Sequence, residues 1–468
     1  MILKRLLKGD FNLWVLIAIF CFSRIFYYCY FGLRFDASPL PYYWQYLDID
    51  LLKHHLIQSL FYLNSLTPGF NFFLGVVLKL FPNQYPEVFH LIYLAFGLLF
   101  CITLFLLMIE IGLNVHLSLC LTSLYITSPM VFEYENWLFY EYPSAALLSL
   151  SLLFLLRFSK RNEFSDVLTF FSLLAVIIYV RGLFSIYWFL FVLCFLLVIK
   201  KQEWKKIVLA CAVPFLLIFA LYFKNLMIFH SFSINDAQTG VSLGYTVIRP
   251  LPEAPRLVAE KKISGLYQIL PFDTDFSKYA PYGIQPRITG IPALDEQQRP
   301  SGYPNTNNLV FIAVGQQEMK DALYVLKHYP RPVLTRLGAI FFEGYYGFSD
   351  ECRPFYDQSH WGTWAQWDDF YKDFILGRVV PINYSVSKIG FQLLLTYGFF
   401  LIFRSFVGRN LDSTRGLIFI FMVMTIIYLM SGSFFIWQDW PRYRFLVDPF
   451  YLIFLGLFLN NRLKKYLG

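Results

Sequence analysis

Carboxylates close to the ends of apolar runs are the side chains of this sequence best suited to chemistry. Asp36 follows the first long apolar run, within the stretch RFDASPLPYYWQ. A carboxylate held among aromatic side chains at a membrane exit can take a proton from a substrate, which is the work of a general base. The plain alternative is a loop acid that contacts only water. We expect Asp36 to be catalytic, and Gln45, at the end of the same stretch, to contact a substrate.

Two further acids begin the next stretch, DIDLLKHHLIQSLFYL. Asp48 and Asp50 precede apolar residues whose spacing predicts an amphipathic helix. Acids are favoured at a helix N-terminus because they accept hydrogen bonds from free backbone N–H groups. Asp48 and Asp50 are therefore candidates for catalysis, and helix capping is the competing interpretation for at least one of them.

A second acidic segment, FEYENWLFYEYP (132–143), lies at the boundary of a later apolar run. It places Glu133, Glu135 and Glu141 among aromatic residues. An interfacial aromatic belt explains the rings, but it does not require three carboxylates. We predict that these acids bind a sugar or an acceptor amine.

Several basic residues lie where few are expected, inside apolar runs or at their outer ends. Charges within a membrane are expensive and are functional candidates by default. Arg and Lys clamp phosphate oxygens, so a lipid-borne phosphate would explain them. Headgroup anchoring, or snorkelling towards the interface, is the alternative. The predicted phosphate- or lipid-binding residues are Arg24, Arg181, Lys224, Arg442 and Arg444.

Metal and nucleotide chemistry find little support in the sequence. Most of the seven cysteines lie in apolar runs, and no zinc-type spacing is present. No metal site is predicted, and a divalent cation is left open without a motif to support it. No Gly-rich phosphate loop is found, so a nucleotide-activated donor is not expected on the cytoplasmic side. The net charge of +8 comes from small basic clusters between apolar runs, which indicates membrane topology and not nucleic-acid binding.

Composition identifies the elements that must carry these residues. The chain has 468 residues, of which 57% are hydrophobic and 15% are charged. Several apolar runs reach the length of a membrane-spanning helix, so we predict an all-α polytopic membrane protein. The first run follows a short basic segment and is expected to be a retained signal anchor. The expected spans are 11–33, 89–110, 115–132, 143–158, 166–180, 183–200, 207–229, 388–404, 416–436 and 446–461.

Basic residues between the spans orient them. When the basic clusters are placed in the cytoplasm, about ten spans close consistently, with both termini inside. The apolar segment 67–82 is short, and counting it as a crossing would move the later clusters outside. We therefore expect this segment to be a juxtamembrane or re-entrant helix on the outer side.

Three parts follow from this topology. An N-terminal transmembrane module (1–229) contains the first outer loop (34–88), which carries the predicted catalytic acids. A large extracytoplasmic region (230–387) comes next, and its second half is expected to form helices that lie on the membrane plane, with a break at Pro330. C-terminal transmembrane helices (388–468) complete the chain.

The motifs occur in a characteristic order. RFDAS follows the first span, and YLNSLTPGFN, YENWLFYEYP, KNLMIFHSFS and RYRFLVDPF come after it. This set resembles the GT-C superfamily of membrane glycosyltransferases, most of all the bacterial relatives of protein O-mannosyltransferases and of the lipid A aminoarabinose transferases (glycosyltransferase family 39-like). The resemblance implies a GT-C fold, Asp36 as base, and phosphate-binding cations that match loosely at Lys224, Arg442 and Arg444. Leu66-Thr67-Pro68-Gly69 departs from relatives with a basic residue and a Pro pair, so no donor-phosphate contact is implied there.

The resemblance also implies an activity. The chain would be an inverting hexosyl- or pentosyltransferase of the cell envelope, with a polyprenyl-phosphate sugar as donor and a glycan, lipid or protein as acceptor. It would contact membrane lipids and lie in the bacterial inner membrane, with its active site facing the periplasm. The alternatives are a lipid-linked polysaccharide ligase or polymerase, and a polytopic transporter or flippase. We find none of the paired repeats that transporters show.

Overall fold

The computed structural model describes residues 10–335, 338, 361–371, 378–379, 384–385, 393–394, 396–403, 414–432 and 440–467. Within these residues the chain is mainly helical. Its strands β1 (Arg378–Val379) and β2 (Tyr384–Ser385) form one short antiparallel pair. The predicted helical class is confirmed for this part of the chain.

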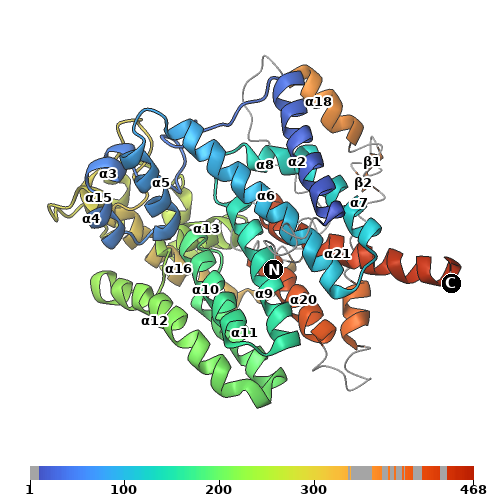
Figure 1. The fold of residues 1–468 in the computed structure, drawn as a ribbon. Helices are drawn as coiled ribbons and strands as arrows, with labels where there is room; N and C mark the ends of the chain where they lie inside the picture. The colour runs from blue at the N-terminus through green and yellow to red at the C-terminus, as the bar shows by residue number, and fades with distance from the viewer. Residues whose placement is uncertain are drawn as a thin grey trace.

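Most of the apolar helices form one bundle (Figure 1). Its members are α2 (Phe11–Tyr30), α6 (Tyr85–Ile111), α7 (Val115–Ile126), α8 (Pro129–Glu135), α9 (Glu141–Arg161), α10 (Phe164–Val180), α11 (Ile186–Ile199), α12 (Trp204–Phe229), α20 (Thr414–Gly432) and α21 (Trp440–Leu467).

The helices of the first outer loop and of the region after residue 229 are shorter. They are α3 (Ile49–His54), α4 (Leu56–Phe61), α5 (Pro68–Leu80), α13 (Asp236–Leu243), α14 (Ala254–Ala259), α15 (Pro292–Asp295), α16 (Leu309–His328) and α18 (Trp361–Phe370). Short 3-10 and π-helical segments complete the set: η1 (Lys201–Glu203), η2 (Gly244–Ile248), η3 (Leu266–Gln268) and η4 (Phe276–Tyr282).

Six of the described helices are long and apolar enough to cross a membrane, namely α2, α6, α9, α12, α20 and α21. Taken together as one bent span, α7 and α8 make a seventh. Helices α10 and α11 are apolar but have only 17 and 14 residues. The protein is therefore a polytopic membrane protein, and the count of ten spans stays a prediction. The expected span 388–404 is helical at 396–403 and lies partly outside the described residues.

Helix α5 covers most of the segment expected not to cross the membrane. It has 13 residues, which at about 1.5 Å per residue is shorter than a hydrocarbon core of about 30 Å. Its length therefore suits a juxtamembrane or re-entrant helix. The expected break near Pro330 is confirmed, because α16 ends at His328.

The bend between α7 and α8 has a local cause. The two helices meet at an angle of 62°, and the residues between them include Ser128, which precedes Pro129. A residue before proline avoids the helical conformation, and proline starts a new helix readily because its first turn needs no N–H donor. Ser128 Oγ accepts a hydrogen bond from the Val131 amide at 3.4 Å and caps α8. The bend turns α8, with Glu133 and Glu135, against α6, α9 and α18.

Helix α9 is the centre of the bundle. It packs against α6, α10, α20 and α21, and its apolar residues are almost all buried. Helices α2, α11 and α12 instead carry large apolar side chains on the outside, such as Phe22 and Leu209, which are 71% and 66% exposed. An apolar exterior of this kind is the surface that contacts lipid in a membrane protein.

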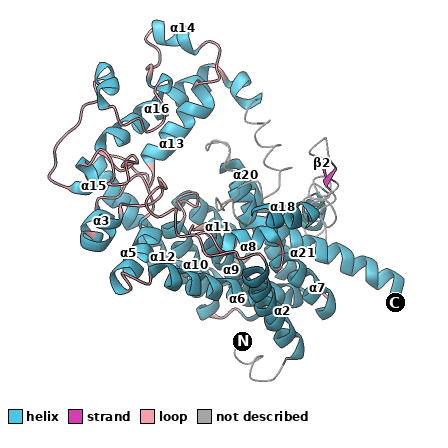
Figure 2. Cartoon of the chain, turned by 90° about the horizontal axis from the view of Figure 1, so that it is seen from above, coloured by secondary structure: helices cyan, strands magenta, loops and turns pink. Residues whose placement is uncertain are grey.

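Helices that follow residue 229 form a separate layer at one end of the molecule. Figure 2 shows α13, α14 and α16 gathered there, away from α2 and α7. Helices α13 and α16 pack backbone to backbone, because a side chain at Gly240 would overlap the carbonyl oxygen of Gly315. Figure 1 shows α3, α4, α5 and α15 side by side next to this layer, and the first two contact α5.

Candidate functional site

Asp36 is held against the second acidic segment, 132–143. Its amide donates to the carbonyl of Asn136 at 2.7 Å, and its carbonyl accepts from the amide of Leu138 at 2.9 Å. This pairing forms a parallel bridge to Trp137. The carboxylate is half-buried, and its Oδ1 accepts the Ser38 amide at 2.9 Å. The two acidic segments singled out from the sequence therefore meet at this bridge.

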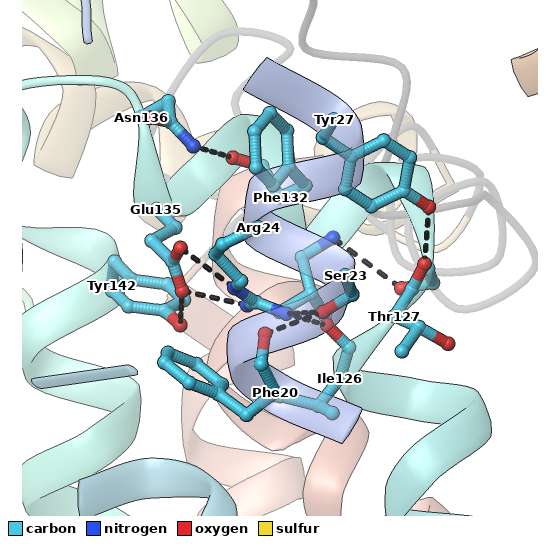
Figure 3. A network of polar contacts seen from close by, with 12 residues as sticks. Phe20, Ser23, Arg24, Tyr27, Ile126, Thr127, Phe132, Glu135, Asn136 and Tyr142 are labelled. Carbon is cyan, nitrogen blue, oxygen red and sulfur yellow. Dashed lines mark hydrogen bonds and ion pairs between the residues drawn. The ribbon is translucent and has the colours of Figure 1, made fainter. Parts of the chain in front are cut away.

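Arg24 and Glu135 form a buried ion pair at the base of the same segment (Figure 3). Arg24 Nε donates to Glu135 Oε1 at 2.9 Å, and Nη2 donates to Oε2 at 2.7 Å. Arg24 Nη1 donates to Ser23 Oγ and to the carbonyl of Ile126. Glu135 Oε2 also accepts the hydroxyl of Tyr142 at 2.6 Å. A side chain at Gly97 would overlap these groups, so glycine there leaves room for the carboxylate.

These contacts favour a structural role for Arg24 and Glu135. The donors of Arg24 are turned to protein acceptors, and both side chains are almost fully buried. Glu133 is similarly engaged, because its Oε1 accepts the indole N–H of Trp364 in α18 at 2.8 Å. The ligand-binding roles predicted for Arg24, Glu133 and Glu135 therefore stay predictions.

A second charged cluster brings together Arg181, Glu141 and Arg442. Arg181 follows α10, Glu141 starts α9, and Arg442 lies near the start of α21. Arg181 Nη2 is 3.0 Å from Glu141 Oε1, and Arg442 Nη1 is 3.6 Å from the same oxygen. All three side chains are buried. One carboxylate oxygen of this triad thus lies within reach of two buried guanidinium groups.

Aromatic rings enclose the triad. The guanidinium of Arg181 lies 4.4 Å from the ring centre of Tyr140 and 5.0 Å from that of Tyr443, and Arg442 lies 4.9 Å from that of Phe139. Contacts of this kind stabilise a cation away from water. Among the described residues, Arg181 Nε has no hydrogen-bond acceptor. A buried N–H without a partner is costly, so this guanidinium is suited to bind an anion.

A pocket adjoins this cluster and contains the predicted residue Gln45. Its empty volume is about 300 Å³, including space open to solvent. Tyr140, the ring that stacks on Arg181, forms part of its wall, as do Val180 and Gly182, the chain neighbours of Arg181. The polar side chains in the lining are uncharged: Gln45, Thr67, Asn71, Asn235 and Gln238.

The segment TPGFN builds one side of this pocket. Thr67 Oγ1 donates to the carbonyl of Val180 at 3.0 Å, which ties α5 to the end of α10. A Cβ at Gly69 would lie 2.6 Å from the carbonyl oxygen of Tyr179, so glycine permits this close approach. Asn71 Oδ1 accepts the Leu47 amide at 2.7 Å, and its Nδ2 donates to the carbonyl of Gln45 at 3.2 Å. These bonds fix the backbone that presents Gln45.

Sequence reasoning did not single out the amide side chains of Asn71, Asn235 and Gln238. Asn71 belongs to the quoted segment YLNSLTPGFN, so a signal was present there. Asn235 and Gln238 lie in SINDAQ, at and within the start of α13, which no periodic apolar pattern marked. Only the packing of α13 beside the first outer loop brings them to the pocket.

The other two cations predicted to bind phosphate, Lys224 and Arg444, have partners outside the triad. Lys224 Nζ donates to the carbonyls of Phe61 and Leu63, both at 2.8 Å, and so anchors the end of α4. Arg444 Nε donates to Asp448 at 2.8 Å, one turn along α21. These contacts favour structural roles for both cations.

Asp48 and Asp50 belong to the start of α3. Asp48 Oδ1 accepts the Asp50 amide at 2.8 Å, so the expected helix cap is confirmed for Asp48. Asp50 is exposed and pairs with His54 at 2.7 Å. Burial, together with the charges of Asp48 and Asp50, raises the pKa of Glu296. The two aspartates therefore interact with Glu296, beyond residue 229 in the chain.

No group of three or more His, Cys, Asp or Glu residues that could hold a metal ion is found in the described part of the chain. Comparison with models of protein families, with curated proteins and with solved structures returned no match. Fold and site together define a mainly helical polytopic membrane protein in which a buried cluster of two arginines and one glutamate lies beside a polar pocket. Its activity has to be argued from these residues.

Proposed function

We propose that this protein is a membrane glycosyltransferase that moves a sugar from a polyprenyl-phosphate donor to an acceptor. The observation that carries the proposal is the buried guanidinium of Arg181, with an unpartnered Nε, beside a pocket lined by uncharged polar groups. Phosphate oxygens are the anions that arginine binds best, because its N–H groups match their geometry.

The composition of the pocket supports a sugar as the group bound next to the phosphate. Amides and hydroxyls donate and accept hydrogen bonds, as sugar hydroxyls do. Gln45, Asn235 and Gln238 supply such groups from the first outer loop and from the start of α13. The aromatic ring of Tyr140 adds an apolar face, which suits the C–H face of a sugar ring.

In the proposed reaction a carboxylate acts as the base, and arginine side chains stabilise the leaving group. Asp36 takes the proton of the acceptor nucleophile as that nucleophile bonds to the anomeric carbon. The bond from that carbon to the phosphate oxygen breaks, and its electron pair leaves with the phosphate. The configuration inverts because attack and departure occur on opposite faces of the sugar. Arg181 and Arg442 stabilise the departing charge, so no acid has to protonate it.

The proposed orientation places this chemistry at the outer face of a bacterial inner membrane. It rests on the distribution of basic clusters in the sequence, which favours cytoplasmic termini. Glu141 and Arg181 then lie at the outer ends of α9 and α10, and Asp36 lies in the loop that follows the outer end of α2. A donor carried by a lipid is the activated sugar that can reach this face.

Donor binding tests the proposal directly. The full-length protein in detergent is titrated with a polyprenyl phosphate, and the same titration is made with Arg181→Gln and Arg181→Lys. Loss of a charge-assisted contact weakens binding by about tenfold to a hundredfold for the glutamine variant, and the lysine variant recovers part of it. Arg256→Gln, which changes an exposed arginine on α14, is the matched control.

Equal binding by wild type and Arg181→Gln would remove the phosphate site. A transporter or flippase is separated by a second measurement on liposomes that contain the protein and a labelled polyprenyl-phosphate sugar. Movement of the label between leaflets without loss of the sugar would favour transport. Release of the sugar to an acceptor supports the transferase.

A further inference from the structure

A second pocket lies in the extracytoplasmic region and has a different character. Its empty volume is about 280 Å³, including space open to solvent. The lining is aliphatic and aromatic, with the rings of Tyr245, Tyr267, Phe272 and Tyr279. Its acidic lining residue is Glu318 of α16.

Glu318 is a buried acid that lacks, among the described residues, the basic partner that usually compensates a buried carboxyl group. The residue is 5% exposed. Among the described residues, its Oε2 has no hydrogen-bond partner, and no basic side chain forms an ion pair with it. Gly244 of η2 leaves space for the carboxyl, because a Cβ there would lie 2.8 Å from Oε1. Burial of a carboxyl group without a partner costs free energy, and an apolar side chain such as leucine at this position would avoid that cost. The acid is therefore suited to binding a ligand.

The neighbouring acid adds to the negative potential. Asp321, one turn further along α16, accepts hydrogen bonds from the Ser264 amide and from Gln317, so its oxygens are well solvated by the protein. Burial raises the pKa of the Glu318 carboxyl well above its ordinary value, and the charge of Asp321 raises it further. A cation that enters the pocket would reverse this effect and ionise Glu318.

The aromatic rings favour the same kind of ligand. Ring faces attract cations, and Tyr245 already stacks on the guanidinium of Arg249 at 4.7 Å. Tyr267 and Tyr279 line the same pocket as Glu318. Aromatic faces and one carboxylate together recognise an ammonium group, whereas a neutral hydroxyl would gain only a single hydrogen bond.

We propose that this pocket binds an organic ammonium ion carried on a small apolar body, with Glu318 as its counter-ion. The pocket shares a wall with the first one: Gln238 of α13 lines the first, and Val241 of the same helix lines the second. The proposal does not depend on sugar transfer, because its test measures binding alone.

The test compares two probes of nearly the same shape, benzylamine and benzyl alcohol, with the full-length protein in detergent. Isothermal titration is expected to show benzylamine binding more tightly than benzyl alcohol by about tenfold or more. Glu318→Gln keeps the volume and is expected to remove this preference. Glu260→Gln changes an exposed glutamate and is expected to leave the preference intact.

A further variant addresses the pocket itself. Leu270 lines the pocket and is 63% exposed, so Leu270→Trp narrows the entrance without disturbing a buried core, and it should weaken benzylamine binding. The proposal is overturned if wild type and Glu318→Gln bind benzylamine equally. It is also overturned if benzyl alcohol binds as tightly as the amine, or if the wild type binds neither probe.

Discussion

Arg24 of α2 and Glu135 of α8 are 111 residues apart in the sequence, and their side chains are joined by two parallel hydrogen bonds of 2.9 and 2.7 Å. This pair fastens the first helix to the outer loop that carries Trp137. The same loop holds Asp36 through backbone hydrogen bonds. The ion pair therefore supports the position of the proposed base without touching it.

Removal of one partner of this pair should destabilise the protein strongly. Arg24→Met leaves Glu135 buried and uncompensated, and loss of one partner of a buried pair costs about 3–5 kcal/mol. Thermal unfolding in detergent should show a lower Tm. The double variant Arg24→Met/Glu135→Leu should recover part of the loss, because no charge stays buried alone.

The control for this prediction is an exposed pair. Arg256 and Glu260 lie 3.3 Å apart on the surface of α14, and exposed pairs contribute little to stability. Arg256→Met should therefore melt close to the wild type. If Arg24→Met also had a Tm close to that of the wild type, the buried pair would not stabilise the fold.

The second prediction concerns Asp36. Asp36→Asn keeps the backbone bridge to Trp137, because the bridge uses main-chain atoms. Loss of a general base lowers the transfer rate by about 10²–10⁴, while binding of the polyprenyl phosphate should stay within about twofold, since Arg181 is unchanged.

The rate is measured by mass spectrometry as loss of the sugar from a polyprenyl-phosphate sugar that is added to the protein in detergent. Asp275→Asn, which changes an exposed aspartate near the start of η4, serves as control. Full activity of Asp36→Asn would exclude Asp36 as the base. Loss of donor binding in the same variant would indicate a structural role instead.

The third prediction is a pH dependence of stability caused by Glu318. Burial and Asp321 raise the pKa of this carboxyl in the folded protein above 4.5, its ordinary value. Below that value both folded and unfolded chains hold the proton, and no difference arises. As the pH rises, the unfolded chain releases the proton first, so the folded state loses stability until the pH passes the folded pKa.

Glu318→Gln removes this loss. The variant should resemble the wild type at about pH 4 and be the more stable of the two at about pH 8. Hydrogen exchange of α16 and thermal unfolding measure the difference. Asp321 and Tyr279 interact electrostatically with Glu318, Tyr245 and Tyr267 line the same pocket, and all four are present in both proteins. Parallel pH profiles for the two proteins would show that Glu318 ionises normally.

The elements of the fold could largely be predicted from the sequence. The expected span 11–33 corresponds to α2, 89–110 to α6 and 207–229 to α12, because an apolar run of sufficient length forms a helix wherever it lies in lipid. The expected 115–132 span proved to be two helices bent at Ser128-Pro129. The Ser-Pro dipeptide is a signal for a helix break, but a prediction based on hydrophobicity treats the continuous apolar run as one span.

The sequence predicted which charged residues belong to the site, but it did not predict which of them pair with one another. Arg24, Arg181 and Arg442 were all expected to bind phosphate, and Glu135 and Glu141 to bind substrate. In the structure Arg24 is paired with Glu135, and Arg181 and Arg442 share Glu141. These contacts connect helices that are far apart in the chain, and no local spacing specifies which helix lies next to which.

The amino-acid sequence by itself determined that this chain is a helical membrane protein with acids and arginines at the ends of its helices. Those properties are local, since hydrophobicity and helix periodicity act over one or two turns. Only the tertiary structure decided which charges are neutralised and which stay available. The reason is that burial and partner distance set the energy of a charge, and both depend on how distant helices pack.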